Sequence, residues 1–284
     1  MNAIDSLLAG LIDYAGLYPP AGLDMHTAVR KYLEYGHCAQ RRALGRFVVD
    51  LDRFPYLWDA AGDYARGLRL SVIASPDADW VEVQRLIDKG YAIEAVEIKT
   101  TEPAEIECVA KRLPAGLTAY FEAPVNGVPA ATLDAIAAVD GRIKIRMGGL
   151  AAGAFPTPKA TAEMLAEMVR RRMVFKATAG LHHPLRGRYP LTYAPESPTA
   201  VMHGFVNLVC AAAVLYFGGE AEEAREVLEE EWPGAWQVTP EAMVWQENGW
   251  SGDELREVRQ KLFAGFGSCS FEEPMRGLEA LGWL

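Results

Sequence analysis

The sequence predicts a single (β/α)8 barrel with a helical insertion before its last strand. About seven short apolar strands alternate with longer helices before residue 180, and an eighth strand-like stretch lies near the C-terminus. The 284 residues also match the length of one such barrel. No G-x-G-x-x-G motif follows the first strand, which makes an open dinucleotide-binding sheet the weaker alternative.

The expected strands are short runs rich in aliphatic and β-branched residues. They span residues 12–18, 46–51, 68–74, 93–99, 117–122, 142–146, 173–178 and 265–271. The intervening helices begin at capping or proline signals, such as Asp24 and Pro103, and one ends at Gly90. These helices are expected at residues 25–35, 56–65, 79–89, 101–113, 130–138 and 159–170, after a short helix at 5–11.

The pattern changes after Pro190. Helices are expected at residues 200–217, 220–231, 251–263 and 274–281, with a small hairpin at 236–245. No linker rich in Gly, Ser or Pro divides the chain, so residues 1–284 are interpreted as one domain with an insertion at about 191–263. The tryptophans of this insertion either cover a subunit interface of a homo-oligomer or form a local core; they are Trp232, Trp236, Trp245 and Trp250.

Composition excludes several classes of function. The net charge of -10 leaves no basic excess for nucleic-acid binding. The four cysteines are far apart without a C-x-x-C pair, which argues against structural zinc and a disulfide framework. No basic region opens the chain, and the most apolar run, residues 200–219, contains His203 and Asn207 and is too short to span a membrane comfortably. A cytoplasmic protein without membrane contact is therefore expected.

Four successive strands carry charged or polar side chains on one face. Because residues two apart in a strand share a face, the pairs are Glu97 with Lys99, Tyr120 with Glu122, Lys144 with Arg146, and Lys176 with Thr178. In an antiparallel sheet this face would lie in water, whereas in a barrel it points inward and its charges must pair with one another or with a ligand. The six charged side chains sum to two positive charges in excess, which favours a small anionic substrate at the C-terminal ends of the strands.

The lysine of the 173–178 strand is the candidate nucleophile. Lys176 either forms an imine with a substrate carbonyl or serves as an ion-pair partner of Glu122. Glu122 is the candidate general acid/base, and Lys144 a proton shuttle or a cation near Lys176. The expected substrate-binding residues are Glu97, Lys99, Arg146, Gly148, Gly149, Thr178, His182, His183 and Ser268.

A metal-dependent hydrolase or isomerase is the second hypothesis. His182 or His183 could join His203 and Glu122 in holding a divalent metal ion, although two adjacent histidines in an extended chain point opposite ways. The first hypothesis, in which Lys176 forms an imine, needs no metal or cofactor. The third hypothesis is a non-catalytic barrel that binds an anion.

Several stretches of this sequence resemble segments of a bacterial family of hypothetical proteins without an assigned activity. They are residues 15–21, 144–149, 175–184 and 266–274. At the level of fold, a lysine on a late strand with a second lysine and a glutamate on preceding strands is similar to class I aldolases. This resemblance implies a Schiff-base lyase for an oxo acid or sugar phosphate, with Lys176 as imine former and Lys144 and Glu122 handling protons.

Overall fold

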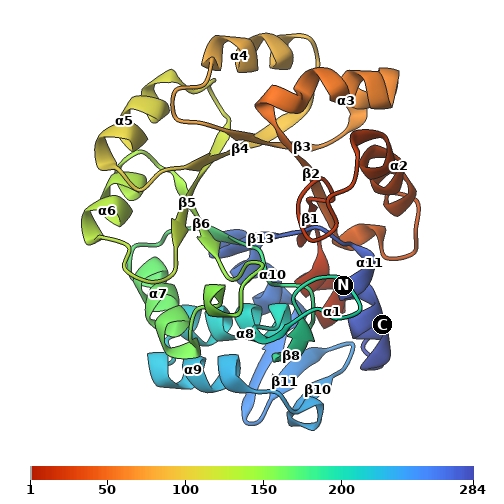
Figure 1. Cartoon of the computed structure of the whole chain (residues 1–284). Helices are drawn as coiled ribbons and strands as arrows, with labels where there is room; N and C mark the ends of the chain where they lie inside the picture. The colour runs from red at the N-terminus through yellow and green to blue at the C-terminus, as the bar shows by residue number, and fades with distance from the viewer. Residues whose placement is uncertain (1) are drawn as a thin grey trace.

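The computed structural model describes residues 2–284 and contains a closed barrel of eight parallel strands (Figure 1). The strands follow the order β1-β13-β7-β6-β5-β4-β3-β2 around the barrel. Their bounds are β1 (Ile12–Tyr14), β2 (Leu44–Asp50), β3 (Leu70–Ala74), β4 (Ile93–Lys99), β5 (Thr118–Pro124), β6 (Arg142–Arg146), β7 (Phe175–Thr178) and β13 (Phe263–Ser268). The predicted (β/α)8 barrel is confirmed, and the open sheet and the antiparallel sheet are both excluded by this pairing.

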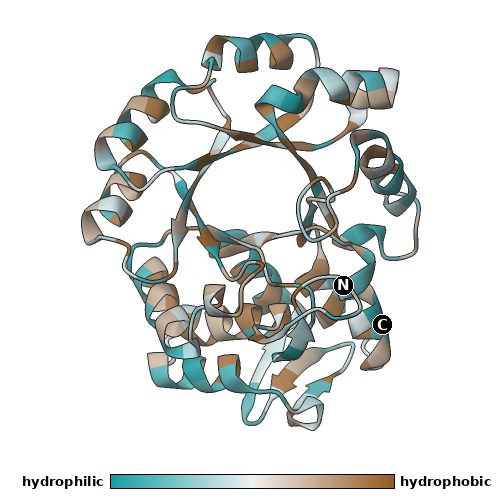
Figure 2. Ribbon diagram, viewed as in Figure 1, coloured by the Kyte–Doolittle hydropathy of each residue, from teal (hydrophilic) through white to brown (hydrophobic). Residues whose placement is uncertain are grey.

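Helices surround the barrel and cover the outer faces of its strands (Figure 1). They are α1 (Ala3–Leu8), α2 (Met25–Tyr35), α3 (Phe54–Ala61), α4 (Trp80–Asp88), α5 (Pro103–Arg112), α6 (Ala130–Ala138), α7 (Pro158–Arg170), α8 (Phe205–Tyr216), α9 (Ala221–Glu229), α10 (Gly252–Lys261) and α11 (Glu272–Ala280). Figure 2 shows apolar residues concentrated in the strands and hydrophilic residues on the outer helix surfaces. This distribution is the one that burial of apolar surface predicts for a barrel covered by helices.

Local sequence signals begin several of these helices. The Asp24 side chain accepts a hydrogen bond from the Thr27 amide at the start of α2. Thr157 caps α7 just before Pro158, and Ser251 forms a capping box with Glu254 at α10. Each cap satisfies amide groups that the helix itself leaves without a partner. Helix α8 is buried on nearly every residue because it packs against α7, α9 and α10.

The region 191–263 contains more than the predicted helices. Strands β8 (Gly187–Pro190) and β9 (Thr199–Met202) form an antiparallel hairpin, and β10 (Trp236–Val238), β11 (Ala242–Trp245) and β12 (Asn248–Ser251) form a second small sheet. The expected helix over 200–217 therefore begins at Phe205, because residues 199–202 pair with β8. The expected hairpin gains a third strand. The description of this region as helical was incomplete, since periodicity alone does not separate a short apolar strand from a helix.

The tryptophans of this region form a local core. Trp236, Trp245 and Trp250 are buried, and the Trp236 ring lies 6.3 Å from the rings of both Trp245 and Trp283. Only Trp232 among the four predicted residues is exposed. Trp236, Trp245 and Trp250 therefore belong to a core within one chain. Across residues 2–284, no helix is both long and apolar enough to cross a membrane.

Candidate active site

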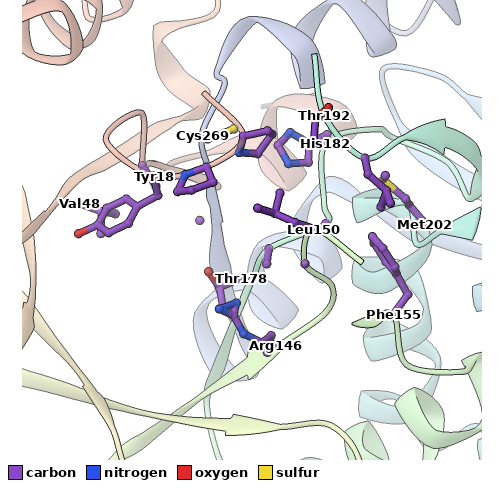
Figure 3. A pocket seen from close by; sticks show the side chains of 18 of the residues that line it. Tyr18, Val48, Arg146, Leu150, Phe155, Thr178, His182, Thr192, Met202 and Cys269 are labelled. Carbon is purple, nitrogen blue, oxygen red and sulfur yellow. The ribbon is translucent and has the colours of Figure 1, made fainter. Parts of the chain in front are cut away.

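A cavity of about 660 Å³ opens at the C-terminal ends of the barrel strands. The ends of β4, β5 and β6 supply Glu97, Lys99, Glu122, Lys144 and Arg146 to its wall. Loop residues close the other side, and Figure 3 shows His182, Thr192 and Cys269 together opposite Arg146 and Thr178. This is the end of the fold at which barrel enzymes carry out their chemistry.

A chain of ion pairs with alternating charge crosses the barrel beneath and along this cavity. Its members are Asp13, Lys176, Glu97, Lys144 and Glu122, and we call them the ion-pair chain. Successive members are 2.5, 2.7, 2.7 and 2.7 Å apart, measured between lysine Nζ and carboxylate oxygen atoms. An arginine extends each end, with Arg46 3.8 Å from Asp13 and Arg146 3.6 Å from Glu122. Every buried charge of the ion-pair chain therefore has an opposite charge beside it, as burial requires.

Strand register brings these side chains together. Lys144 on β6 pairs with Lys176 on β7, and with Glu122 on β5 on its other side. The strands were predicted to place their charged face inside the barrel, and the burial of Glu97, Lys144 and Lys176 agrees with that prediction. Lys99 and Arg146 differ, because they lie at the last positions of their strands and remain exposed at the cavity mouth.

Lys176 is a structural cation. Lys176 is 2% exposed and lies outside the cavity wall. Its Nζ contacts both Asp13 Oδ2 and Glu97 Oε1. Burial alone would lower the pKa of Lys176, but the attraction of the Asp13 and Glu97 carboxylates outweighs it and raises the pKa above its ordinary value. A protonated amine without room for substrate beside it is a poor nucleophile. The geometry therefore argues against Lys176 as the imine former, and its partners are Asp13 and Glu97 rather than Glu122.

Glu97 is held ionised between two lysines. Burial would raise the pKa of its carboxyl, but Lys144 and Lys176 together lower that pKa. The Ser71 hydroxyl also donates to Glu97 Oε1 at 2.6 Å. Although Glu97 reaches the cavity wall, both of its oxygens are thus already bonded. Glu97 therefore positions the two lysines, and its role in binding substrate stays a prediction.

Lys144 and Glu122 form the part of the ion-pair chain that borders the cavity. Lys144 Nζ lies 2.7 Å from Glu97 Oε2 and 2.7 Å from Glu122 Oε2. The Glu122 side chain is 15% exposed, and both residues line the cavity. This contact combines an amine with an adjacent carboxylate that can take its proton, a pairing suited to nucleophilic and acid–base chemistry.

The predicted anion-binding residues occupy different places. Lys99, Arg146, Gly149 and Thr178 line the cavity. Gly148 does not, and a Cβ atom there would lie 2.5 Å from the Phe155 ring, so this glycine permits close packing.

Ser268 is also absent from the cavity wall. Its buried hydroxyl donates to the Ser270 carbonyl at 2.7 Å, so it stabilises the turn after β13.

A second polar cluster faces the cavity from the loops. His182 Nδ1 lies 3.0 Å from Glu273 Oε2, and the Tyr193 hydroxyl donates to the same oxygen at 3.1 Å. His183 Nε2 is 3.9 Å from Glu273 Oε1, and Cys269 Sγ is 3.6 Å from the Tyr193 hydroxyl oxygen. A carboxylate bonded to one imidazole nitrogen fixes the ring and leaves the other nitrogen for proton transfer.

Electrostatics distinguish the members of this second cluster. Burial would raise the pKa of Glu273, but the hydrogen bonds from His182 and Tyr193 lower it, so Glu273 is ionised. Burial lowers the pKa of His183 to about 4, against the opposing pull of Glu273. The His183 ring also stacks on Tyr189 with centroids 3.5 Å apart. His183 is thus a neutral packing residue near neutral pH, and His182 is the better candidate for proton transfer.

The predicted metal ligands are not brought together. His203 is buried outside the cavity, with its Nε2 2.8 Å from the Pro156 carbonyl oxygen, and Glu122 is bonded to Lys144. Within residues 2–284, no group of three or more His, Cys, Asp or Glu side chains is arranged to hold a metal ion. The metal-dependent hypothesis therefore lacks its proposed ligand set.

Sequence reasoning missed Glu273 and Tyr193. Glu273 was open to detection, because it follows the last barrel strand and lies in the first turn of α11, where active-site residues gather. Tyr193 lies in the turn between β8 and β9, and nothing in the sequence directs that turn over the barrel. No protein-family model matches the chain, and no curated protein matches it either.

Proposed function

We propose that this protein is an imine-forming lyase that acts on a small oxo acid, with Lys144 as the nucleophile. The observation that carries the proposal is the contact of Lys144 Nζ with Glu122 at 2.7 Å in the wall of the cavity. Lys176, the other buried lysine of the ion-pair chain, has no access to that cavity. The class I aldolase chemistry expected from the fold is thus retained, with its nucleophile moved to β6.

Imine formation uses Lys144 and Glu122. The Lys144 ammonium gives one proton to the Glu122 carboxylate, and the free amine bonds to the carbonyl carbon of the substrate. Glu122 returns that proton to the former carbonyl oxygen and then carries a second proton from the nitrogen to the resulting hydroxyl group, which leaves as water and yields a protonated imine. The positive nitrogen then accepts the electron pair of a neighbouring C–C bond, which is the advantage of covalent catalysis by an amine.

Cleavage needs a base for the substrate hydroxyl, and we assign this role to His182, which lines the cavity and is bonded to Glu273. When His182 accepts that proton, the C–C bond breaks, one fragment leaves as a carbonyl compound, and the electron pair forms an enamine with Lys144. Protonation of the enamine carbon and addition of water release the second product and restore the Lys144 ammonium. Lys99 and Arg146 at the mouth of the cavity would hold the substrate carboxylate.

The enamine step can be tested without knowing the full substrate. In D₂O, the protein should replace methyl protons of pyruvate, or protons on C3 of longer 2-oxo acids, by deuterium, followed by proton NMR. Lys144→Arg should abolish the exchange, because arginine keeps the charge but forms no imine. Lys159→Arg, a change at an exposed lysine of α7, should leave the exchange unchanged. Exchange that persists in Lys144→Arg would contradict the proposal. Binding of oxo acids without exchange in the unaltered protein would instead favour the anion-binding barrel.

The His182–Glu273 pair supports a second candidate, an isomerase that moves a proton without a covalent intermediate. This candidate rests on the 3.0 Å contact between His182 Nδ1 and Glu273 Oε2 in the cavity. The two candidates differ in which variant is inactive. Deuterium exchange that survives Lys144→Arg but is lost in His182→Gln would select the isomerase.

A further inference from the structure

We infer that the natural substrate is a carboxylate with an apolar chain or ring, and not a sugar phosphate. This inference rests on the proposed function for its catalytic setting, because it concerns the same cavity. It goes further in choosing between the two classes of anion that a cationic barrel site can accept. Three features of the cavity carry it: an apolar wall, helix N-termini closed to phosphate, and cations that are largely paired with carboxylates.

The apolar wall lies between Arg146 and the β8–β9 hairpin. Figure 3 shows Phe155 and Met202 close together at one side of the cavity with Leu150 nearer its middle, and Leu191 also lines it. Phe155, Leu191 and Met202 belong to a small hydrophobic cluster separate from the main core. Leu150 is 54% exposed in the cavity wall. An apolar substrate group placed there would remove this leucine surface from water, which a polyhydroxylated sugar would not achieve.

The helix N-termini that could receive phosphate near this cavity are already used. In many barrels the phosphate is bound by amides after the last two strands, at a helix N-terminus. Here the first amides of α8, those of Phe205 and Val206, donate to the carbonyls of His183 and Pro184 at 3.0 Å each. The other helix, α11, begins with Glu272 and Glu273, whose carboxylates would repel a phosphate dianion.

The remaining charges suit a single negative charge. Of the cations in the cavity wall, Lys144 is bonded to two carboxylates, which leaves Lys99 and Arg146 for a ligand. Arg146 is itself 3.6 Å from Glu122. One carboxylate group can be held by such a pair of cations at the cavity mouth. A dianion would meet only these two cations, of which Arg146 is already partly neutralised by the Glu122 carboxylate beside it.

The test uses simple carboxylates that have no oxo group, so that imine formation plays no part. The dissociation constants of propanoate, butanoate, pentanoate and hexanoate are measured by NMR titration, with glycerol 3-phosphate as the sugar-phosphate probe. Each added methylene should tighten binding by about fourfold if it is buried in the apolar wall. Hexanoate should also bind more tightly than glycerol 3-phosphate. Equal affinities along the series, absence of any carboxylate binding, or tighter binding of the phosphate would each overturn the inference.

Two variants separate the roles of charge and apolar contact. Leu150→Ala should reduce the gain per methylene, because it removes part of the wall, while Val81→Ala at an exposed site on α4 should not. Arg146→Gln should weaken every carboxylate by a similar factor and leave the gain per methylene unchanged. A steep series in a protein that exchanges no oxo-acid protons would refute the lyase and keep this substrate class. Deuterium exchange of oxo acids together with equal affinities along the carboxylate series would keep the lyase and refute this substrate class.

Discussion

Replacing Lys176 by methionine should destabilise the fold strongly. The substitution keeps most of the side-chain volume but removes the cation that joins Asp13 to Glu97 at 2.5 and 2.7 Å. Both carboxylates are almost fully buried, so each would lose a charge partner in a medium of low polarity. Breaking a buried ion pair on one side costs about 3–5 kcal/mol.

The partners that remain place the expected loss near the lower end of that range. Glu97 keeps Lys144 at 2.7 Å and the Ser71 hydroxyl at 2.6 Å. Asp13 keeps the Arg46 amide, which donates to its Oδ1 at 2.7 Å. We therefore expect a loss of about 3 kcal/mol in the free energy of unfolding. At a slope of about 3 kcal/mol per molar urea, the unfolding midpoint would fall by about 1 M.

Urea unfolding followed by circular dichroism measures this loss. Lys159→Met is the matched control, because Lys159 is exposed and only 3.9 Å from Glu163, and it should change the stability by less than about 0.5 kcal/mol. Adding Asp13→Asn to Lys176→Met should cost less than the two single changes summed, since neutral asparagine no longer needs the cation. A loss below about 1 kcal/mol for Lys176→Met would refute the interpretation of Lys176 as a required structural cation.

Three further predictions concern packing, pH and the hairpin. Gly45→Ala should lower the free energy of unfolding in urea by more than about 2 kcal/mol, because a Cβ atom would overlap the buried Asp13 carboxylate on β1. Gly67→Ala is the control: it has open space around it and should cost less than about 1 kcal/mol. Equal costs for the two changes would contradict this prediction. Burial lowers the pKa of His203 to about 4 from 6.5, so the unfolded chain binds a proton first as the pH falls and stability declines from pH 6.5 to 4. His203→Gln should flatten that decline by about 1.4 kcal/mol per pH unit, measured by urea unfolding at several pH values, and an unchanged slope would count against a neutral buried His203. Tyr193→Phe should speed amide hydrogen exchange in residues 191–198 by about fivefold, because the loss of its hydrogen bond to Glu273 releases the hairpin tip; unaltered exchange would show that this bond does not hold the tip.

The barrel could be predicted because its signals are local and repeated. Each strand is a short apolar run, and the period of two correctly placed Glu97, Lys144 and Lys176 inside. What periodicity does not contain is the pairing between distant strands. Asp13, at the start of the chain, neutralises Lys176, which is 163 residues later. The choice between the two lysines depends on this contact and on which lysine reaches the cavity, and both are tertiary features that the sequence does not contain.

The loop cluster was harder to predict for a different reason. His182 was selected because it follows a buried strand, yet its partner Glu273 lies 91 residues further along. The hairpin that carries Tyr193 is held by contacts of Leu191 and Met202 with Phe155, which is in the loop after β6. Such tertiary contacts between loops leave no periodic pattern in the sequence.

The most direct test of the account is to find which lysine forms the imine. The protein is treated with borohydride in the presence of 4-methyl-2-oxopentanoate or pyruvate, and the adduct is located by intact mass and peptide mapping. We predict a single adduct on Lys144, absent in Lys144→Arg, and none on Lys176, which lies outside the cavity wall and is 2% exposed. An adduct on Lys176, or deuterium exchange without any trapped adduct on Lys144, would contradict the central claim.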